Sequence, residues 1–169
     1  MKALVLYSSL TGNTEKIGKA ISEAIPFEKE IHSVDESYNL EKYDLIVIGY
    51  WVNKGICDNK VKQILENIEN KNIVLFGTLG AKDSGHYYES TKKRIEEVVA
   101  SSNKVLGHFL CQGKIDERLT ERYKEMLKKN PDDEHIKQQL QNHAEASSHP
   151  DFNDIEMAKD FINNIIKDF

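Results

Sequence analysis

The sequence lacks the features that mark membrane, disulfide-rich and cysteine-metal proteins. None of its 169 residues lies in an apolar run approaching the ~18 residues of a transmembrane helix, so we expect no membrane insertion. The apolar run that follows Met1 and Lys2 is too short for a signal peptide, which predicts a cytoplasmic protein. The two cysteines, Cys57 and Cys111, are far apart and lack metal-ligand spacing, so they are expected to be free thiols.

The sequence also lacks an excess of positive charge. The formal net charge is −5, and the imbalance is confined to one end of the chain. Residues 1–129 hold 20 Lys and Arg against 19 Asp and Glu, whereas residues 130–169 hold 3 against 9. We therefore expect no nucleic acid partner.

Residue patterns typical of catalysis or of histidine-bound metals are missing as well. Asp83, Ser84 and His86 are the residue types of a hydrolase triad, but they crowd into one short loop, where the triad geometry is hard to build. The candidates for a histidine-bound metal are His135, His143 and His149. No two of them have the i, i+3 or i, i+4 spacing of metal ligands on one helical face. The sequence therefore predicts neither a catalytic residue nor a metal site.

What the chain does contain is an alternation of buried strands and amphipathic helices. Four apolar runs have the length and β-branched content of strands buried on both faces: Ala3 to Tyr7, Leu45 to Tyr50, Ile73 to Thr78 and Val105 to Cys111. A fifth run, Glu28 to Val34, alternates like an edge strand. The segments between these runs have helical periodicity, so we predict an α/β fold with a parallel sheet covered on both faces.

The last third of the chain contains no further strand. Apolar residues spaced as in helices occur near Leu119 to Leu127 and near Ile136 to Ala144. A long amphipathic stripe runs from Ile155 to Phe169, with Asp151 or Asp154 near its N-cap. We predict one domain over residues 1–169, in which residues 114–150 form a helical insertion before the last helix that covers the sheet.

The segment "YSSLTGNTEKIG", from Tyr7 to Gly18, indicates a phosphate site. Small hydroxyl and amide residues and Gly12 follow the first strand and precede the first helix, so several backbone N–H groups lie at a helix N-terminus. Neither G-x-x-x-x-G-K-[ST] nor G-x-G-x-x-G is present, which disfavours the two common nucleotide loops. A neutral loop suits a terminal monophosphate; the alternative is a turn that only caps the helix.

Ser9 to Thr14, "SLTGNT", resembles the flavodoxin signature [ST]-x-T-G-x-T, which in that family also follows the first strand. The resemblance covers about residues 1–113 and the last helix, and implies a five-stranded, doubly wound sheet of order 2-1-3-4-5 that binds FMN through this loop. "FLCQGKID", "YWVNKG" and the insertion look like one flavodoxin-like subfamily, some members of which accompany bilin reductases as accessory proteins.

In that fold, the loops that leave strands one, three and four form one cleft. The resemblance implies cofactor contacts in each loop: Ser8, Ser9, Leu10, Thr11, Gly12, Asn13 and Thr14; Tyr50, Trp51, Val52, Asn53, Lys54 and Gly55; Thr78, Leu79, Gly80, Ala81, His86 and Tyr87. Trp51 is expected to stack on or flank the flavin, with a core tryptophan as the alternative. Ala81 stands where short flavodoxins often carry tryptophan. The second wall of the ring is then left to His86, Tyr87 or Leu79, and one face of the ring is expected to be partly uncovered. Lys54 is expected to stabilise the reduced, anionic flavin, unless it is only a solvated loop lysine.

Two functions are compatible with this reading. In the first, the protein is an electron carrier whose partner is a reductase or a terminal reductase. In the second, it is an FMN-dependent oxidoreductase that acts directly on a small molecule such as a quinone or a tetrapyrrole. The sequence favours the carrier, because it has no evident acid/base pair and no nicotinamide motif. A module of flavodoxin shape without flavin is disfavoured by the intact phosphate loop.

Overall fold

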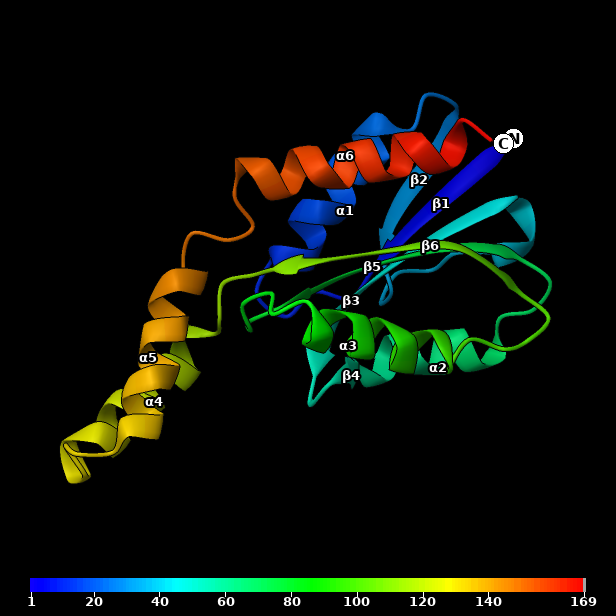
Figure 1. Ribbon diagram of the computed structural model, residues 1–169. Helices are drawn as coiled ribbons and strands as arrows, with labels where there is room; N and C mark the ends of the chain where they lie inside the picture. Colours follow the sequence, from blue (N-terminus) through cyan, green and yellow to red (C-terminus); the bar gives the residue numbers. More distant parts are fainter. Residues whose placement is uncertain (169) are drawn as a thin grey trace.

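A parallel β-sheet between two layers of helices forms the body of the molecule in the computed structural model, which describes residues 1–168 (Figure 1). The sheet order is β2-β1-β3-β5-β6, and all four neighbouring pairs are parallel. The strands span β1, Lys2–Tyr7; β2, Glu28–Ser33; β3, Leu45–Asn53; β5, Asn72–Leu79; and β6, Lys104–Gln112. This confirms the predicted five parallel strands and their doubly wound order.

The sheet buries apolar side chains on both faces, as expected for strands that read as continuous apolar runs. On one face, Leu4 of β1 and Ile46 of β3 pack with helix α2 (Asn59–Asn67) and helix α3 (His86–Glu96). On the other face, Val5 packs with helix α1 (Asn13–Ala24) and helix α6 (Phe152–Ile166). The alternation along each strand therefore distributes the core between the two helical layers.

Helix boundaries agree with local sequence signals. Helix α1 ends at Ala24, two residues before Pro26, which has no amide hydrogen to donate. Helix α6 begins after Asp151, whose side chain accepts a hydrogen bond from the Asp154 amide in a capping box. The predicted extension of this last helix to Phe169 is not observed as far as the structure describes the chain, because α6 ends at Ile166 and Phe169 lies outside the described residues.

Strand β3 continues beyond its predicted end and turns back on itself. It runs to Asn53 and pairs antiparallel with the two-residue strand β4, Ile56–Cys57. The connecting residues, Lys54 and Gly55, have φ of 52° and 79°, as in a type I′ hairpin turn. Residues 51–53, which were expected in a loop, are therefore strand residues. Lys54 lies in the turn of the hairpin, so the pairing of β3 with β4 determines its position.

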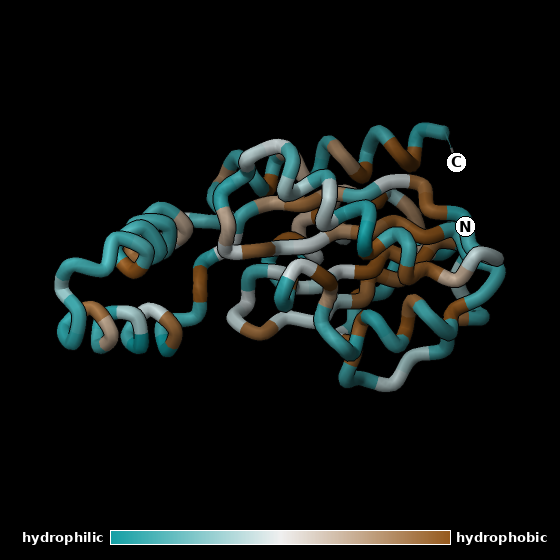
Figure 2. The backbone as a smooth tube through the Cα atoms, turned by 60° about the horizontal axis from the view of Figure 1, so that its bottom comes forward, coloured by the Kyte–Doolittle hydropathy of each residue, from teal (hydrophilic) through white to brown (hydrophobic). Residues whose placement is uncertain are grey.

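The predicted insertion forms a pair of helices that project from the body of the protein. Helix α4 (Glu117–Lys129) and helix α5 (Glu134–Ala146) lie side by side beyond the end of β6 (Figure 1). We call this pair the α4–α5 arm. Most residues of the arm are hydrophilic, whereas the hydrophobic residues concentrate in the body of the protein, above all in the strands (Figure 2). No residue of α4 is buried.

Within residues 1–168, no helix is long and apolar enough to span a bilayer.

A polar network runs from the core to the surface on the α2 and α3 side of the sheet, from buried Tyr50 through His108 to exposed Glu96. The Tyr50 hydroxyl donates to Nε2 of His108 at 2.7 Å, and Nδ1 of His108 donates to Glu96 at 2.8 Å. Burial lowers the pKa of His108 to about 3, with Lys92 acting in the same direction. The imidazole is therefore neutral at pH 7, with its remaining proton on Nδ1.

This network predicts a pH dependence of stability. The pKa of His108 is below its unfolded value of about 6.5, so the unfolded chain binds more protons between about pH 6.5 and 3. The His108 contribution is fully present above pH 6.5 and falls by about 1.4 kcal/mol for each pH unit below it. Urea unfolding of the wild type and His108→Gln between pH 7 and 4.5 measures the effect. The wild type should lose more stability than the variant on acidification; parallel pH curves would contradict this account.

Candidate functional site

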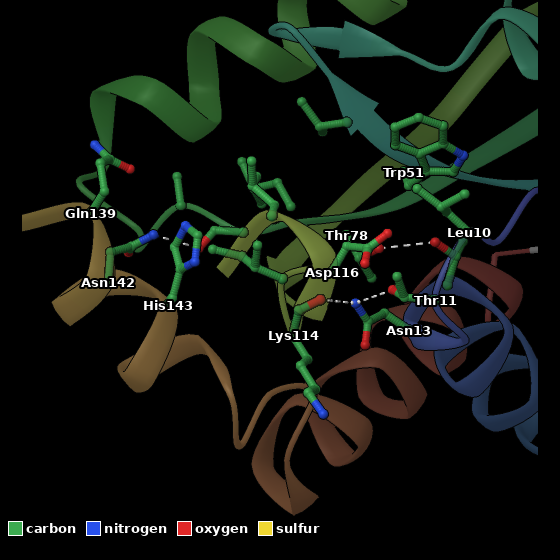
Figure 3. Close-up of a pocket in the computed structure, with 18 of the residues that line it drawn as sticks. Leu10, Thr11, Asn13, Trp51, Thr78, Lys114, Asp116, Gln139, Asn142 and His143 are labelled. Atoms are coloured by element: carbon green, nitrogen blue, oxygen red, sulfur yellow. Dashed lines mark hydrogen bonds between the residues drawn. The ribbon is translucent and has the colours of Figure 1, made fainter. Parts of the chain in front are cut away.

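A cavity of about 330 Å³ opens where β1, β3, β5 and β6 end (Figure 3). These are the carboxyl ends of parallel strands, where ligands of open α/β sheets bind. Its lining comes from the first βα loop, from β3 and β5 with the loop that follows β5, and from the α4–α5 arm. The predicted site residues that it brings together are Leu10, Thr11, Asn13, Thr14, Trp51, Val52, Thr78, Leu79, Gly80 and Ala81.

The first βα loop presents backbone amides that are not used within the protein. Helix α1 begins after Gly12, which adopts φ +90° and carries no side-chain cap. Within residues 1–168, no acceptor is bonded by the amides of five residues: Ser9, Leu10, Thr11, Asn13 and Thr14. Amides at a helix N-terminus carry partial positive charge, so this loop is suited to an anion.

The loop hydroxyls have different roles from one another. The Ser8 hydroxyl donates to the buried Asp58 carboxylate at 3.0 Å, so it holds the loop instead of facing the cavity. The Thr14 hydroxyl lies 2.9 Å from that of Thr78 and 3.3 Å from the Tyr50 carbonyl, and Thr14 is 1% exposed. Ser9 accepts from the Gly12 amide at 3.1 Å. Thr11 remains exposed at the cavity, where its hydroxyl accepts from Asn13.

Asn13 connects the loop to the segment that leads into the arm. Its side-chain amide donates to the Lys114 carbonyl at 2.8 Å and to the Thr11 hydroxyl at 3.0 Å (Figure 3). A Cβ on Gly113 would lie 2.7 Å from the Asn13 amide nitrogen, so the two segments require a glycine to approach this closely. The first βα loop and the segment that leads into the arm are therefore packed directly against each other.

Apolar groups from β3 and β5 form the middle of the cavity. Trp51 is half-buried at the end of β3 and lines the cavity at the same end as Leu10, which is 56% exposed (Figure 3). Leu79 is nearly buried, and Ala81 extends no large side chain into the space. An aromatic face and aliphatic groups beside backbone donors suit a flat conjugated ligand.

A second, adjoining cavity extends this cleft toward the β3–β4 hairpin. It shares Val52, Leu79, Gly80 and Ala81 with the first and adds Lys54, Gly55, Tyr87 and Arg94. Arg94 donates to the Gly55 carbonyl at 2.9 Å, so a second cation stands beside Lys54. The positive charge that sequence reasoning assigned to Lys54 is thus carried by two side chains. Arg94 was missed because nothing in the spacing of α3 relates it to the hairpin.

Several predicted site residues do not line either cavity. The Tyr50 side chain is fully buried against His108, which leaves only its backbone near the cleft. Its OH cannot contact a ligand there. The other predicted site residues that line neither cavity are Ser8, Ser9, Gly12, Asn53 and His86.

Asp58 is a supporting residue that sequence reasoning missed. One carboxylate oxygen accepts from the Ser8 hydroxyl and from the amides of Lys60 and Val61, which caps α2. The Asp58 amide in turn donates to the Trp51 carbonyl at 3.1 Å. Asp58 therefore joins the ends of β1 and β3 to α2. An aspartate before a helical pattern is an N-cap signal, so the sequence could have predicted the cap of α2 but not the bond to Ser8.

The arm adds polar and aromatic groups to the cavity that were not predicted. They come from the segment that leads into α4, from α4 itself and from α5: Gly113, Lys114, Ile115, Asp116, Leu119, Tyr123, Gln139, Asn142 and His143. The hydrogen bonds from Arg118 hold the pKa of Asp116 below its usual range, and burial lowers that of His143. Near neutral pH this side of the cavity therefore carries a paired carboxylate and a neutral imidazole.

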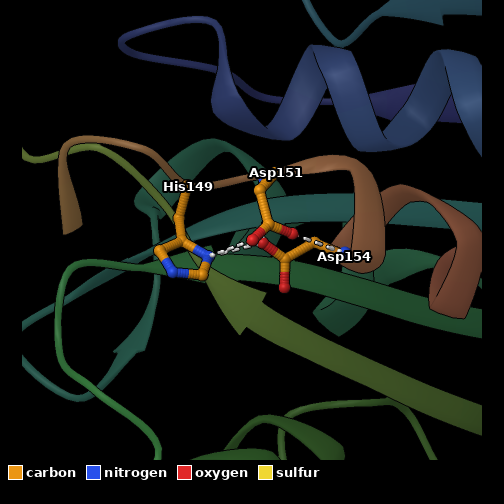
Figure 4. Close-up of side chains that lie close together, drawn as sticks. All are labelled: His149, Asp151 and Asp154. Atoms are coloured by element: carbon orange, nitrogen blue, oxygen red, sulfur yellow. Dashed lines mark hydrogen bonds and ion pairs between the residues drawn. The ribbon is translucent and has the colours of Figure 1, made fainter. Parts of the chain in front are cut away.

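A cluster of His149, Asp151 and Asp154 has its ligand-type atoms within 4.8 Å of one another (Figure 4). Asp154 accepts from Nδ1 of His149 at 2.6 Å and from the Asp151 amide at 2.8 Å, while Asp151 accepts from the Asp154 amide at 3.0 Å. The two bonds between Asp151 and Asp154 form the capping box of α6, and the bond from His149 adds the third member of the cluster. It holds the chain where the arm returns to the body.

A model of the flavodoxin domain family matches residues 4–163 of this chain. A flavodoxin-like domain-containing protein BilS of Clostridioides difficile (strain CD3) is 53% identical, over 98% of this chain and 97% of the relative. The BilS protein of Clostridium symbiosum (strain WAL-14163) is 27% identical, over 96% of this chain and 94% of the relative.

Solved structures share the fold at low sequence identity. Oxidised Flavodoxin 1 from Bacillus cereus has a TM-score of 0.64 and 16% identity, with 100% of this chain and 99% of that chain covered. A flavoprotein from Lactobacillus acidophilus, solved in complex with FMN, has a TM-score of 0.53 and 21% identity, with 64% of this chain and 92% of that chain covered.

Proposed function

This chain belongs to the flavodoxin domain family, and from that premise we propose that it binds FMN and passes electrons to or from a partner redox enzyme. The observation that carries the proposal is the set of loop amides at the start of α1 that bond no acceptor within residues 1–168. Backbone amides at a helix N-terminus have the charge and the donor geometry that a phosphate needs.

The residues of the cleft fit both ends of FMN. The amides and Thr11 would hold the phosphate, and Asn13 completes that end through its bond to Lys114. Trp51, Val52 and Leu79 supply the flat apolar surface that an isoalloxazine ring needs, while the adjoining Gly80 offers backbone groups. Ser8, Thr14 and Asp58 support the loop from beneath, through bonds that leave the loop amides free.

FMN supplies the redox chemistry, since it accepts and releases one or two electrons. The protein residues determine how strongly it is held and which charge is favoured near the ring. Lys54 and Arg94 at the hairpin side of the cleft would favour added negative charge, because opposite charges attract in a partly desolvated site. The donors of the loop would orient the cofactor so that one edge of the cleft remains open to a partner.

Electron transfer to a protein is favoured over direct catalysis on a small molecule. The charged cavity groups of the arm are already paired: Asp116 with Arg118, and Lys114 with Glu117. His143 is neutral near pH 7, with Nδ1 bonded to Thr120 at 2.9 Å. The paired charged groups of the arm therefore leave the neutral His143 imidazole without a free charged partner for proton transfer to a substrate.

We expect the purified protein to carry flavin bands and to release FMN on denaturation. Stopped-flow reduction of the FMN-loaded protein should be slow with NADH or NADPH alone and at least about tenfold faster when a flavodoxin reductase is added, because the sequence contains no nicotinamide motif. Fast reduction by the nicotinamide alone would favour the direct oxidoreductase. A protein that is colourless and does not bind added FMN would overturn the proposal.

Lys54 should raise the potential at which the bound cofactor takes its second electron. Lys54→Met removes a positive charge beside the ring, so this potential should fall by about 40 mV, equivalent to ~1 kcal/mol for a partly exposed charge. Lys62→Met, on α2 and outside both cavities, is the control and should leave the potential unchanged. Potentiometric titration measures both variants; equal potentials in wild type and Lys54→Met would show a lysine with no influence on the cofactor.

A further inference from the structure

We propose that the α4–α5 arm is the second wall of the FMN cleft, in which Leu119 and Tyr123 of α4 and His143 of α5 close the side that Ala81 leaves open. The inference rests on the proposed FMN function and adds the residues that complete its site. All three residues line the same cavity as the first βα loop. Figure 3 shows His143 at this cavity.

The size of the cavity indicates one ligand that touches both ends. Its volume of about 330 Å³ is at the lower end of the ~300–1,000 Å³ range of single-ligand pockets. Thr11 and Asn13 line this cavity at the end formed by the first βα loop. Because the arm residues line that same space, the ligand would contact them instead of leaving room for a second molecule.

The base of the arm is bonded to both loops that bind the cofactor in the proposed function. On one side, Asn13 of the phosphate loop donates to the Lys114 carbonyl. On the other side, the Gly80 carbonyl accepts from Gln112 at 3.0 Å and from Asn142 of α5 at 3.2 Å. A Cβ on Gly80 would lie 2.5 Å from the Ile115 side chain, so the loop and the arm are in close contact. The position of the arm is therefore determined by the loops of the cleft.

The side chains that the arm presents suit a planar ring. The Tyr123 and His143 rings meet edge to face, with centroids 5.3 Å apart, and His143 is 6% exposed. Nδ1 of His143 is bonded to Thr120, whereas no residue within 1–168 bonds its Nε2. An aromatic pair with one free ring nitrogen offers both a contact surface and a hydrogen-bonding group.

Leu119 and Met126 make a matched pair for the test. Both lie on α4, and their exposed fractions are 41% and 42%. Leu119 lines the cavity, whereas Met126 does not. An exposed leucine at the cavity is explained by a ligand that covers it, and the equally exposed methionine serves as the control for loss of an apolar side chain from the same helix.

The test is titration of the apoprotein with FMN, followed by the quenching of flavin fluorescence. Leu119→Ala and Tyr123→Ala should each raise Kd about tenfold, because apolar contact with the ring is lost. Tyr123→Phe retains the ring and should stay within about twofold of the wild type, as should Met126→Ala. Hydrogen exchange of residues 117–146 in the full chain should slow when FMN is added, since α4 has no buried residue and its amides are poorly protected without a ligand.

The outcomes separate this inference from the function on which it rests. Wild-type protein that fails to bind FMN overturns both. Wild-type binding with equal Kd values for Leu119→Ala, Tyr123→Ala and Met126→Ala overturns the wall and leaves the FMN function standing. A loss of affinity confined to the cavity-lining variants, together with slower exchange in the arm, supports the wall. Far-ultraviolet circular dichroism of each variant checks that the arm remains helical.

Discussion

The amides at the start of α1 need an acceptor, and much of the cleft is arranged around that need. A helix N-terminus leaves backbone donors unpaired, and here the N-cap position is a glycine that cannot supply a side-chain oxygen. Two hydroxyls of the loop are already hydrogen-bonded within the protein: Ser8 bonds Asp58, and Thr14 bonds Thr78. These contacts hold the loop and leave its amides without an acceptor within residues 1–168. An anion supplied by a ligand would satisfy them, which connects the local structure of the loop to the proposed function.

The sheet order explains why distant segments meet at this loop. β1 lies between β2 and β3, and the connections on either side of it lead to opposite faces of the sheet, so the loops after β1, β3 and β5 border one crevice. Asp58 and Asn13 then act as ties between elements. Asp58 joins the ends of β1 and β3 to α2, and Asn13 joins the phosphate loop to the base of the arm. The site is thereby built on rigid elements, whereas the arm that borders it has little core of its own.

Sequence reasoning was most successful where one residue pattern has one physical meaning. The strands could be predicted because apolar runs such as Leu45 to Tyr50 are buried on both faces. The flavodoxin relationship could be predicted because the residue types of Ser9 to Thr14 and their place after the first strand coincide. It was less successful where tertiary contacts decide. Nothing local indicates that Tyr50 turns inward to His108, or that Lys54 occupies the left-handed position of a hairpin turn. The arm was predicted as helices, but which of its side chains reach the cavity depends on the contacts of Asn142 and Asn13 with neighbouring loops.

The most direct measurement compares FMN with riboflavin, which has the same ring and ribityl chain without the phosphate. Calorimetric titration of the apoprotein should give at least about 100-fold tighter binding of FMN, since two or more charge-assisted hydrogen bonds from the loop amides are made only to the phosphate. Equal affinity for the two ligands would contradict the account, because the ring would then be bound without any contribution from the start of α1.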